Sequence, residues 1–495
     1  MRRLITPLLV VLALFGPHLA AAAPTPAGMG VEDARHLLAR AGFGAGSADL
    51  ADFSRLGRQQ AVEKLLAPVA ALPADGAPGL DFVPPARFRD AGDADKKELQ
   101  RRQFLDASEL QAWWLGRMLA ARPAEALQER MTLFWHNHFV SSLQKVRSPY
   151  LMLEQNRLLR RHALGNFGLL LHEIGKNPAM VVYLDAATNR KGQPNENFAR
   201  EVMELFTLGE GHYSEQDVKE AARAFTGWSV EPETGAYKWR PFAHDTGSKT
   251  VLGKSGNFDG DDVLDILLAR PETSERIVGK LWLEFISPTP EPAEVARLAR
   301  ILRESGYEMR SVLKALLTSR AFWAAENRGA LVKSPVDLVV GTLRGLEVTS
   351  PDPLPFIFVL RQLGQDLFAP PNVKGWPGGE TWINTNTLLG RNQFIERLLQ
   401  AEASGGEARK IKPAMLRETF GKGANRLDDD NRQRLAQAIN GIRVDSEAWF
   451  RRLADARLLP ESALLAVAPT RTSKAELSNR ERLRQWLLDP AYQVK

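Results

Sequence analysis

The sequence predicts a mainly α fold, a multi-helix, bundle-like globular protein with one small β-hairpin insert near residues 228–260. Apolar residues recur at helical spacing over most of the chain, whereas the alternation typical of a strand is confined to residues 237–240. Of the 495 residues, 44% are hydrophobic and 25% are charged. This composition is typical of a globular protein and excludes disordered and collagen-like chains.

Residues 1–22 have the pattern of a secretory signal peptide. Arg2 and Arg3 form a positive start, residues 4–15 are apolar, and Ala20–Ala22 offer a cleavage site. The apolar stretch is too short for a stable membrane span, and no later run reaches the necessary length. We therefore expect an exported protein, periplasmic or secreted, with no transmembrane segment in the mature chain.

The rest of the chain divides into three segments by composition. Proline, glycine and alanine crowd residues 68–95, which predicts a linker, and residues 404–406 mark a second joint. The segments are 23–95 with the N-terminal helices and the Pro-rich linker, 96–403 with the main helical domain, and 404–495 with the C-terminal helices.

Periodicity and start signals give the helices in order. Asn177 followed by Pro178, and Ser214 three residues before Asp217, are expected helix starts. The predicted elements are two short helices in 31–67, helices throughout 96–227, 262–322 and 335–346, and a loop rich in proline, glycine and tryptophan at 366–387.

Charge and cysteine content exclude several classes of function. Sixty-five basic against 59 acidic residues give a net charge of +6, or +4 without Arg2 and Arg3 (6 − 2 = 4). This small excess, with no basic stripe, gives little reason to expect nucleic acid as a partner. The absence of cysteine excludes disulfides, Cys-ligated zinc and a cysteine nucleophile.

The densest chemical signal is the run Phe134–Phe139, with His136 and His138. In a continuous helix the two rings diverge by about 200° and cannot share a metal ion. If the helix ends near Trp135, an extended chain points both rings the same way, as zinc or copper binding requires. The alternatives are a metal or acid–base role for at least one histidine, or a buried, hydrogen-bonded His138 beside a half-exposed His136.

Two carboxylates lie on the next informative stretch, 195–205. Glu201 and Glu204 project about 60° apart on a helix, so both can face one site. Carboxylates on an apolar bundle helix are usual metal ligands, and with histidine they suit zinc, manganese or iron. The alternative is that the acids of this stretch form i, i+4 ion pairs with Arg200.

Two further histidines follow. His212 lies in a glycine-rich turn directly after that helix, where it either completes the site or caps the helix end. The adjacent His244 and Asp245 offer an acid–base pair, and Lys249 offers a cation for an anionic substrate group. The alternative for this segment is an Asp-initiated turn with a solvated lysine.

The loop 370–384 holds two tryptophans between rigid prolines. Exposed Trp376 and Trp382 rings, with the Asn384 amide nearby, would stack on sugar rings and bind their hydroxyls. The alternative is that both tryptophans anchor the loop in the core.

Taken together, these motifs resemble the bacterial exported family known as domain of unknown function 1800. The resemblance covers nearly the whole mature chain, with the motifs in the family's order. They are 36–44 (HLLARAGFG), 134–139 (FWHNHF), 177–180 (NPAM), 195–201 (NENFARE), 225–228 (FTGW), 244–245 (HD), 333–335 (KSP), 371–379 (PNVKGWPGG) and 487–493 (LLDPAYQ).

The resemblance implies no settled activity. It does imply a possible partner, because such genes often lie beside a family called domain of unknown function 1501, whose fold resembles phosphatases and sulfatases. We therefore expect an exported, metal-dependent enzyme of extracellular or envelope polymers that uses His136 or His138, Glu201, Glu204 and His244–Asp245. The alternative is a non-catalytic module that binds a polysaccharide or the phosphatase-like partner.

Overall fold

The computed structural model describes residues 28–69, 75–403, 412, 416, 427–471 and 476–495. The predicted signal peptide and the predicted joint at 404–406 lie outside these ranges. Helices dominate the described residues, and the strands form two small hairpins, so the predicted mainly α class is confirmed.

The N-terminal part holds more helices than the sequence predicts. Three short helices, not two, occupy 30–65, and a further helix lies inside the predicted linker. That helix begins at Pro85, whose fixed φ suits the first helical position. The helices are α1 (Gly30–Ala41), α2 (Ser47–Ser54), α3 (Arg58–Leu65), α4 (Pro85–Asp90) and the long α5 (Asp93–Ala120).

The next helices begin where the sequence predicts. Asn177 accepts a hydrogen bond from the Ala179 N–H (3.1 Å), and Ser214 accepts one from the Asp217 N–H (3.2 Å). The elements are α6 (Pro123–His138), α7 (Leu143–Val146), α8 (Pro149–His162), α9 (Phe167–Gly175), α10 (Pro178–Tyr183), η1 (Ala186–Thr188), α11 (Asn197–Glu201), the π-helical η2 (Val202–Thr207) and α12 (Glu215–Ala224).

The predicted insert contains two antiparallel hairpins rather than one. In the first, Trp228 pairs with Trp239, and in the second, Lys249 pairs with Gly256. The elements are β1 (Trp228–Val230), β2 (Tyr237–Trp239), the short helix η3 (Pro241–Ala243), β3 (Lys249–Val251) and β4 (Lys254–Gly256).

Helices fill the remainder of the described chain. Up to residue 382 they are α13 (Gly260–Leu268), α14 (Pro271–Phe285), α15 (Pro292–Glu304), α16 (Met309–Leu317), α17 (Arg320–Trp323), η4 (Ala325–Asn327), α18 (Pro335–Gly345), α19 (Leu354–Gln362) and η5 (Gly379–Trp382). The last are α20 (Thr385–Ala403), α22 (Asp429–Asn440), α23 (Ser446–Asp455), α24 (Pro460–Leu464), α25 (Asn479–Leu487) and η8 (Pro490–Gln493).

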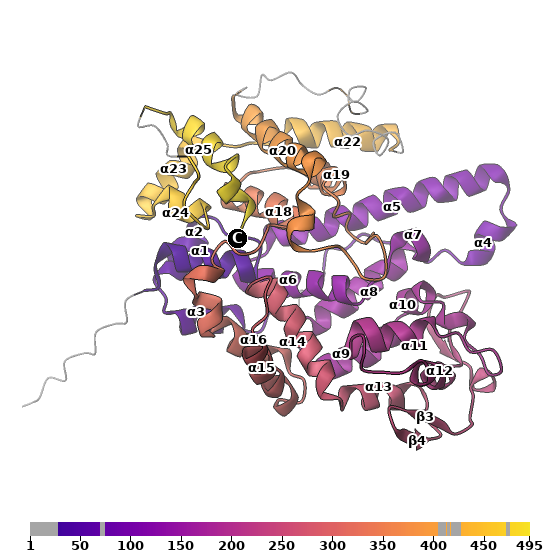
Figure 1. Cartoon of the computed structure of the whole chain (residues 1–495). Coiled ribbons are helices and arrows are strands. Elements are labelled where there is room, and N and C mark those ends of the chain that lie inside the picture. Colours follow the sequence, from indigo (N-terminus) through magenta and orange to yellow (C-terminus); the bar gives the residue numbers. More distant parts are fainter. Residues whose placement is uncertain (1–27, 70–74, 404–411, 413–415, 417–426, 472–475) are drawn as a thin grey trace, which may run out of the picture.

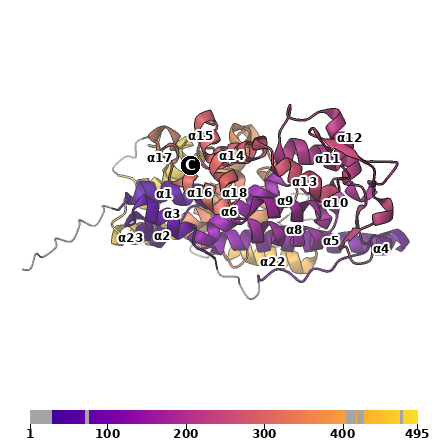
Figure 2. The same cartoon turned by 90° about the horizontal axis from the view of Figure 1, so that it is seen from below.

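The helices α6, α14 and α18 lie in the middle of the molecule (Figure 1). Helices α1–α3 lie toward one end with α23 and α24, and α10–α13 with the hairpins lie toward the other (Figures 1 and 2). Buried apolar side chains of all these parts belong to one continuous core. Among the described residues, no helix combines the length and the apolar character needed to cross a membrane.

Candidate active site

The two histidines of the 134–139 motif leave α6 on different sides. The helix continues to His138, so the extended chain that a shared metal ion requires is not formed. His136 is enclosed by aromatic rings, whereas His138 faces η2 and α14. Their side chains must therefore be considered separately.

His138 has a partner on each ring nitrogen. Nε2 lies 3.1 Å from the Phe206 carbonyl oxygen, which can only accept, so Nε2 carries the proton. Nδ1 is therefore an acceptor, and it receives a hydrogen bond from Lys280 Nζ at 2.9 Å. Burial, with the nearby positive charges of Lys280 and Arg276, holds the pKa of His138 well below its usual value.

Lys280 brings an amine to this histidine from α14. Its Nζ also lies 3.3 Å from the Leu205 carbonyl oxygen. Burial, and to a smaller extent the charge of Arg276, lowers the pKa of Lys280 to about 7. A large fraction of this lysine is therefore a neutral amine at neutral pH.

Arg276 lies one helical turn before Lys280 on the same face of α14. Its Nε donates to the Leu205 carbonyl at 3.2 Å. Like charges four residues apart destabilise a helix. Among the described residues, no carboxylate lies within 4.0 Å of either cation, so no ion pair offsets this repulsion.

The carbonyls that these side chains bind belong to the end of η2. The backbone there is π-helical: the Leu208 N–H bonds to the Met203 carbonyl, and Thr207 Oγ1 donates to the Val202 carbonyl at 2.6 Å. The last carbonyls of a helix have no partner within it. Those of Leu205 and Phe206 are satisfied by α14 and α6, and such π segments are frequent at functional sites.

Arg276 and Lys280 line an open pocket of about 370 Å³. Its walls come from the turn after η2 and from α14, and Leu283 is 47% exposed beside it. The other lining residues are Leu208, Gly209, Glu210, His212, Glu272, Glu275, Gly279 and Pro290. The pocket therefore combines an amine, a guanidinium and the His212 imidazole with the carboxylates of Glu210, Glu272 and Glu275.

Neither Glu201 nor Glu204 is among the residues that line this pocket. Glu204 accepts a hydrogen bond from the Tyr213 hydroxyl at 3.0 Å. Burial, and then the charge of Glu204, raises the pKa of Glu201. The charge of Glu204 also acts on Arg276.

His136 lies elsewhere and is 1% exposed, so the expectation that it is half-exposed is wrong. Among the described residues, neither of its ring nitrogens has a hydrogen-bond partner. Burial lowers its pKa to about 3, so it is neutral in the folded protein. The rings around it are those of Trp114, Phe368 and Trp376.

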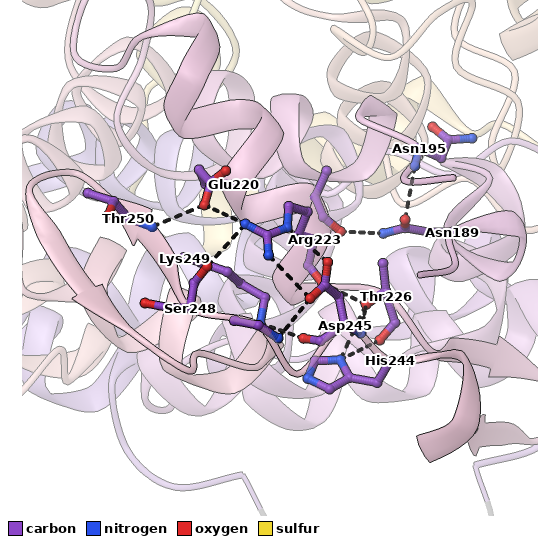
Figure 3. Close-up of polar contacts among 12 residues, drawn as sticks. Asn189, Asn195, Glu220, Arg223, Thr226, His244, Asp245, Ser248, Lys249 and Thr250 are labelled. Carbon is purple, nitrogen blue, oxygen red and sulfur yellow. Dashed lines mark hydrogen bonds and ion pairs between the residues drawn. The ribbon is translucent and has the colours of Figure 1, made fainter. Parts of the chain in front are cut away.

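The predicted acid–base pair after the first hairpin is part of a structural network (Figure 3). Arg223 binds both carboxylate oxygens of Asp245, at 2.9 and 3.2 Å, and holds the pKa of Asp245 at about 2. His244 Nδ1 donates to the Thr226 carbonyl at 3.0 Å. Lys249 is buried and donates to the carbonyls of residues 245 and 247, so it is not solvated.

The tryptophan loop is anchored as the alternative interpretation predicts. Trp376 and Trp382 are 4% and 7% exposed, so neither offers a ring face for a sugar. The Trp376 N–H donates to Asn137 of α6 at 2.7 Å. Asn384 is exposed, and its side chain accepts from the N–H groups that start α20.

The structure thus unites part of the predicted set. His212 lines the α14 pocket, His138 binds Lys280 of that lining, and the charge of Glu204 acts on Arg276 there, while His136, His244 and Asp245 lie elsewhere. Within the described ranges there is no group of three or more histidine or acidic residues able to hold a metal ion.

The sequence analysis misses Arg276 and Lys280, although a signal was present. Two cations one turn apart, beside the buried Ile277 and Leu281, break the usual separation of charged and apolar faces. Such a pair on the buried side of a helix indicates a site.

Comparison with known proteins gives one match. A family model described as Protein of unknown function (DUF1800) matches residues 36–493. No curated protein and no solved structure matches the chain.

Proposed function

The chain belongs to the family described as Protein of unknown function (DUF1800), and we propose that it is an exported enzyme that removes a proton from an anionic extracellular polymer. The observation that carries this proposal is the Lys280 amine in the α14 pocket, hydrogen-bonded to His138 and one turn from Arg276. The signal-peptide pattern of residues 1–22 supports export.

The hydrogen bonds of Lys280 fit a general base. A neutral amine has two N–H bonds, and His138 Nδ1 and the Leu205 carbonyl accept them. The lone pair is then left for a proton from the substrate. Both partners remain acceptors, so they also stabilise the ammonium ion that forms. A pKa near the working pH is best for such a base.

Arg276 supplies the electrostatic part of the proposed reaction. Its guanidinium has no ion pair among the described residues and can hold a substrate carboxylate. Neutralising that carboxylate makes the hydrogen on the adjacent carbon more acidic. In a polyuronate, Lys280 takes that proton and a carbon–carbon double bond forms to the next ring carbon. The bond from that carbon to the glycosidic oxygen breaks, and the leaving oxygen receives the proton from the Lys280 ammonium ion.

The first test uses substrate. Purified protein is incubated with polyuronates, and the ultraviolet absorbance and mass of unsaturated products are followed. We expect Lys280→Met and Lys280→Arg each to reduce the rate about 100-fold or more, because general acid–base catalysis contributes that much and a guanidinium does not deprotonate. The control is Lys97→Met, an exposed lysine on α5, with an unchanged rate. Activity retained in Lys280→Arg would contradict the role of base.

The second test needs no substrate. The rate of Lys280 acetylation is measured against pH by mass spectrometry. We expect the rate to be half-maximal near pH 7, whereas the reference pKa of a lysine in water is about 10.4. A half-maximal rate at Lys280 near pH 10.4 would show that the amine is charged at neutral pH, and the proposal would fail.

A further inference from the structure

A second and larger pocket lies beside the first hairpin, away from α14. Its volume is about 830 Å³, and it shares no lining residue with the α14 pocket. One wall is the loop from η1 to the start of α11, and the other is formed by residues 227–229 and 240–243. The two walls join directly, because the Lys191 N–H donates to the Ala243 carbonyl at 2.7 Å.

Buried polar and apolar groups fix the shape of this pocket. Asn189 is buried, and its amide donates to the Ala222 carbonyl while its oxygen accepts from the Asn195 N–H, as Figure 3 shows. Gly227 has a φ of +91°, and a Cβ there would lie 2.9 Å from the Arg240 carbonyl, so the close approach requires glycine. The buried Trp228 lines the same pocket.

The charged groups of the pocket leave a positive charge without a partner. Among the described residues, the Arg240 guanidinium has no carboxylate or other acceptor, and its Nε is buried without a hydrogen bond. Arg190 donates to the Gln193 side chain at 2.7 Å and has no ion pair within the described chain. Glu196, the acidic residue of the lining, is already paired with Arg200 at 3.2 Å.

An exposed aromatic ring stands at the same pocket. Phe242, on η3, is 83% exposed, the highest value among the exposed large apolar residues of the described chain. Exposing a ring of this size costs free energy that burial against a ligand would recover. An aromatic face also suits the apolar face of a sugar ring, and the amide and hydroxyl groups beside it suit sugar hydroxyls.

We propose that this pocket binds an acidic sugar unit of an oligosaccharide, with Arg240 on the anionic group and Phe242 against the sugar ring. Arg190 adds a second positive charge, and the side chains of Thr188 and Gln193 lie at the same wall for the hydroxyls. The pocket is a binding site and not a second centre of catalysis. It does not depend on the reaction proposed for Lys280, because its residues are distinct.

The experiment compares three probes by isothermal titration calorimetry on the full chain. They are a hexamer of galacturonic acid, which carries both features, a neutral glucose hexamer, and sodium sulfate. The variants are Arg240→Gln and Phe242→Ala, and both should fold, since the first group has no described partner and the second is exposed. The matched controls are Arg89→Gln and Leu169→Ala, which change exposed residues on α4 and α9.

We expect the galacturonate hexamer to bind, and each pocket variant to weaken it about tenfold, as the loss of one charge-assisted hydrogen bond or one ring contact would. Both controls should bind as the parent does. The titrations use the Lys280→Met background, so that the reaction proposed for the α14 pocket does not consume the hexamer.

Three outcomes would overturn the inference. The first is that none of the probes binds. The second is that sulfate binds as tightly as the hexamer and Phe242→Ala has no effect, which would leave a simple anion site. The third is that the hexamer binds equally well to both pocket variants, which would place its site elsewhere.

Discussion

Burial decides the protonation of the groups around the α14 pocket. The pKa values of Lys280 and His138 are both lowered, because burial disfavours their charged forms and the positive charge of Arg276 lies nearby. Two acceptors and one amine are thereby brought together with no carboxylate between them. This arrangement differs from the carboxylate–histidine cluster that the sequence suggested.

The lowered pKa of Lys280 predicts a pH-dependent stability. Between about pH 7 and pH 10.4 the unfolded chain holds a proton on this lysine that the folded chain has lost. The free energy of unfolding must therefore rise with pH across this window. In Lys280→Met we expect that part of the rise to disappear, as measured by urea unfolding at a series of pH values. An equal slope in both proteins would contradict the lowered pKa.

His136 predicts a loss of stability at acidic pH. Its pKa is about 3 in the folded protein and about 6.5 when unfolded, so unfolding takes up a proton between these values. Stability should fall as the pH drops through that window. The free energy of unfolding of His136→Leu should fall less steeply as the pH decreases. The difference in slope should be at most that due to the uptake of one proton on unfolding. The control is Leu169→Ala, because Leu169 is exposed on α9 and carries no titratable group, so the slope in acid should stay unchanged.

At the scale of elements, helix starts could be predicted and the π segment could not. Pro178 and Ser214 act within one turn, so their effect is visible in the local sequence. The shift from i−4 to i−5 hydrogen bonds in 202–207 leaves the apolar pattern almost unchanged. Helix α4 could not be predicted either. It buries none of its residues, so no apolar period marks it inside the alanine- and proline-rich linker.

The π segment predicts an effect of Thr207 on the distant amine. Thr207→Val removes the hydrogen bond to the Val202 carbonyl and should cost about 1 kcal/mol of stability. It should also lower the rate of Lys280 acetylation or change its pH dependence. The reason is that the Leu205 carbonyl, which accepts a hydrogen bond from Lys280, lies in the same π-helical segment. Thr342→Val in α18 removes bonds to the Leu338 carbonyl (2.6 Å) and to the Tyr492 hydroxyl (2.8 Å). It should lower stability at least as much and leave the acetylation unchanged. Equal effects of both variants on acetylation would contradict the link.

At the scale of the whole molecule, a buried ion network joins α6 to α18. Asp337 binds Arg130, and it also binds Lys495 Nζ at 2.7 Å. These two cations keep the pKa of Asp337 far below its usual value despite burial. Such residues lie 158 to 207 positions apart, so their meeting could not be predicted from spacing.

Removing the carboxylate should leave the buried Lys495 without an ion pair and Arg130 with Glu284 (3.1 Å) alone. We expect Asp337→Asn to lower the free energy of unfolding by about 3–5 kcal/mol, as measured by denaturant titration at neutral pH. Asp429→Asn is the control, since Asp429 is exposed at the start of α22 and should change stability by less than about 0.5 kcal/mol. A small effect at position 337 would show that Asp337 is not needed to compensate the charges of Arg130 and Lys495.

The candidate site also depends on contacts between residues that are far apart in the sequence. His138 and Glu204 were predicted from local patterns, but Lys280 meets His138 across 142 positions of sequence. Only the packing of α14 against η2 brings the amine to the histidine. The division into segments at residues 95 and 403 stays a prediction.

The pairing of α1 with α24 has a consequence for biogenesis. Arg35 donates to the Ser462 carbonyl at 3.0 Å, so a helix made almost first is completed by one made almost last. Contacts this distant form slowly, because a long loop must close before they stabilise anything. The face of α1 that meets α24 therefore stays uncovered until α24 has been synthesised, while α2, α6 and α14 can cover its other faces earlier.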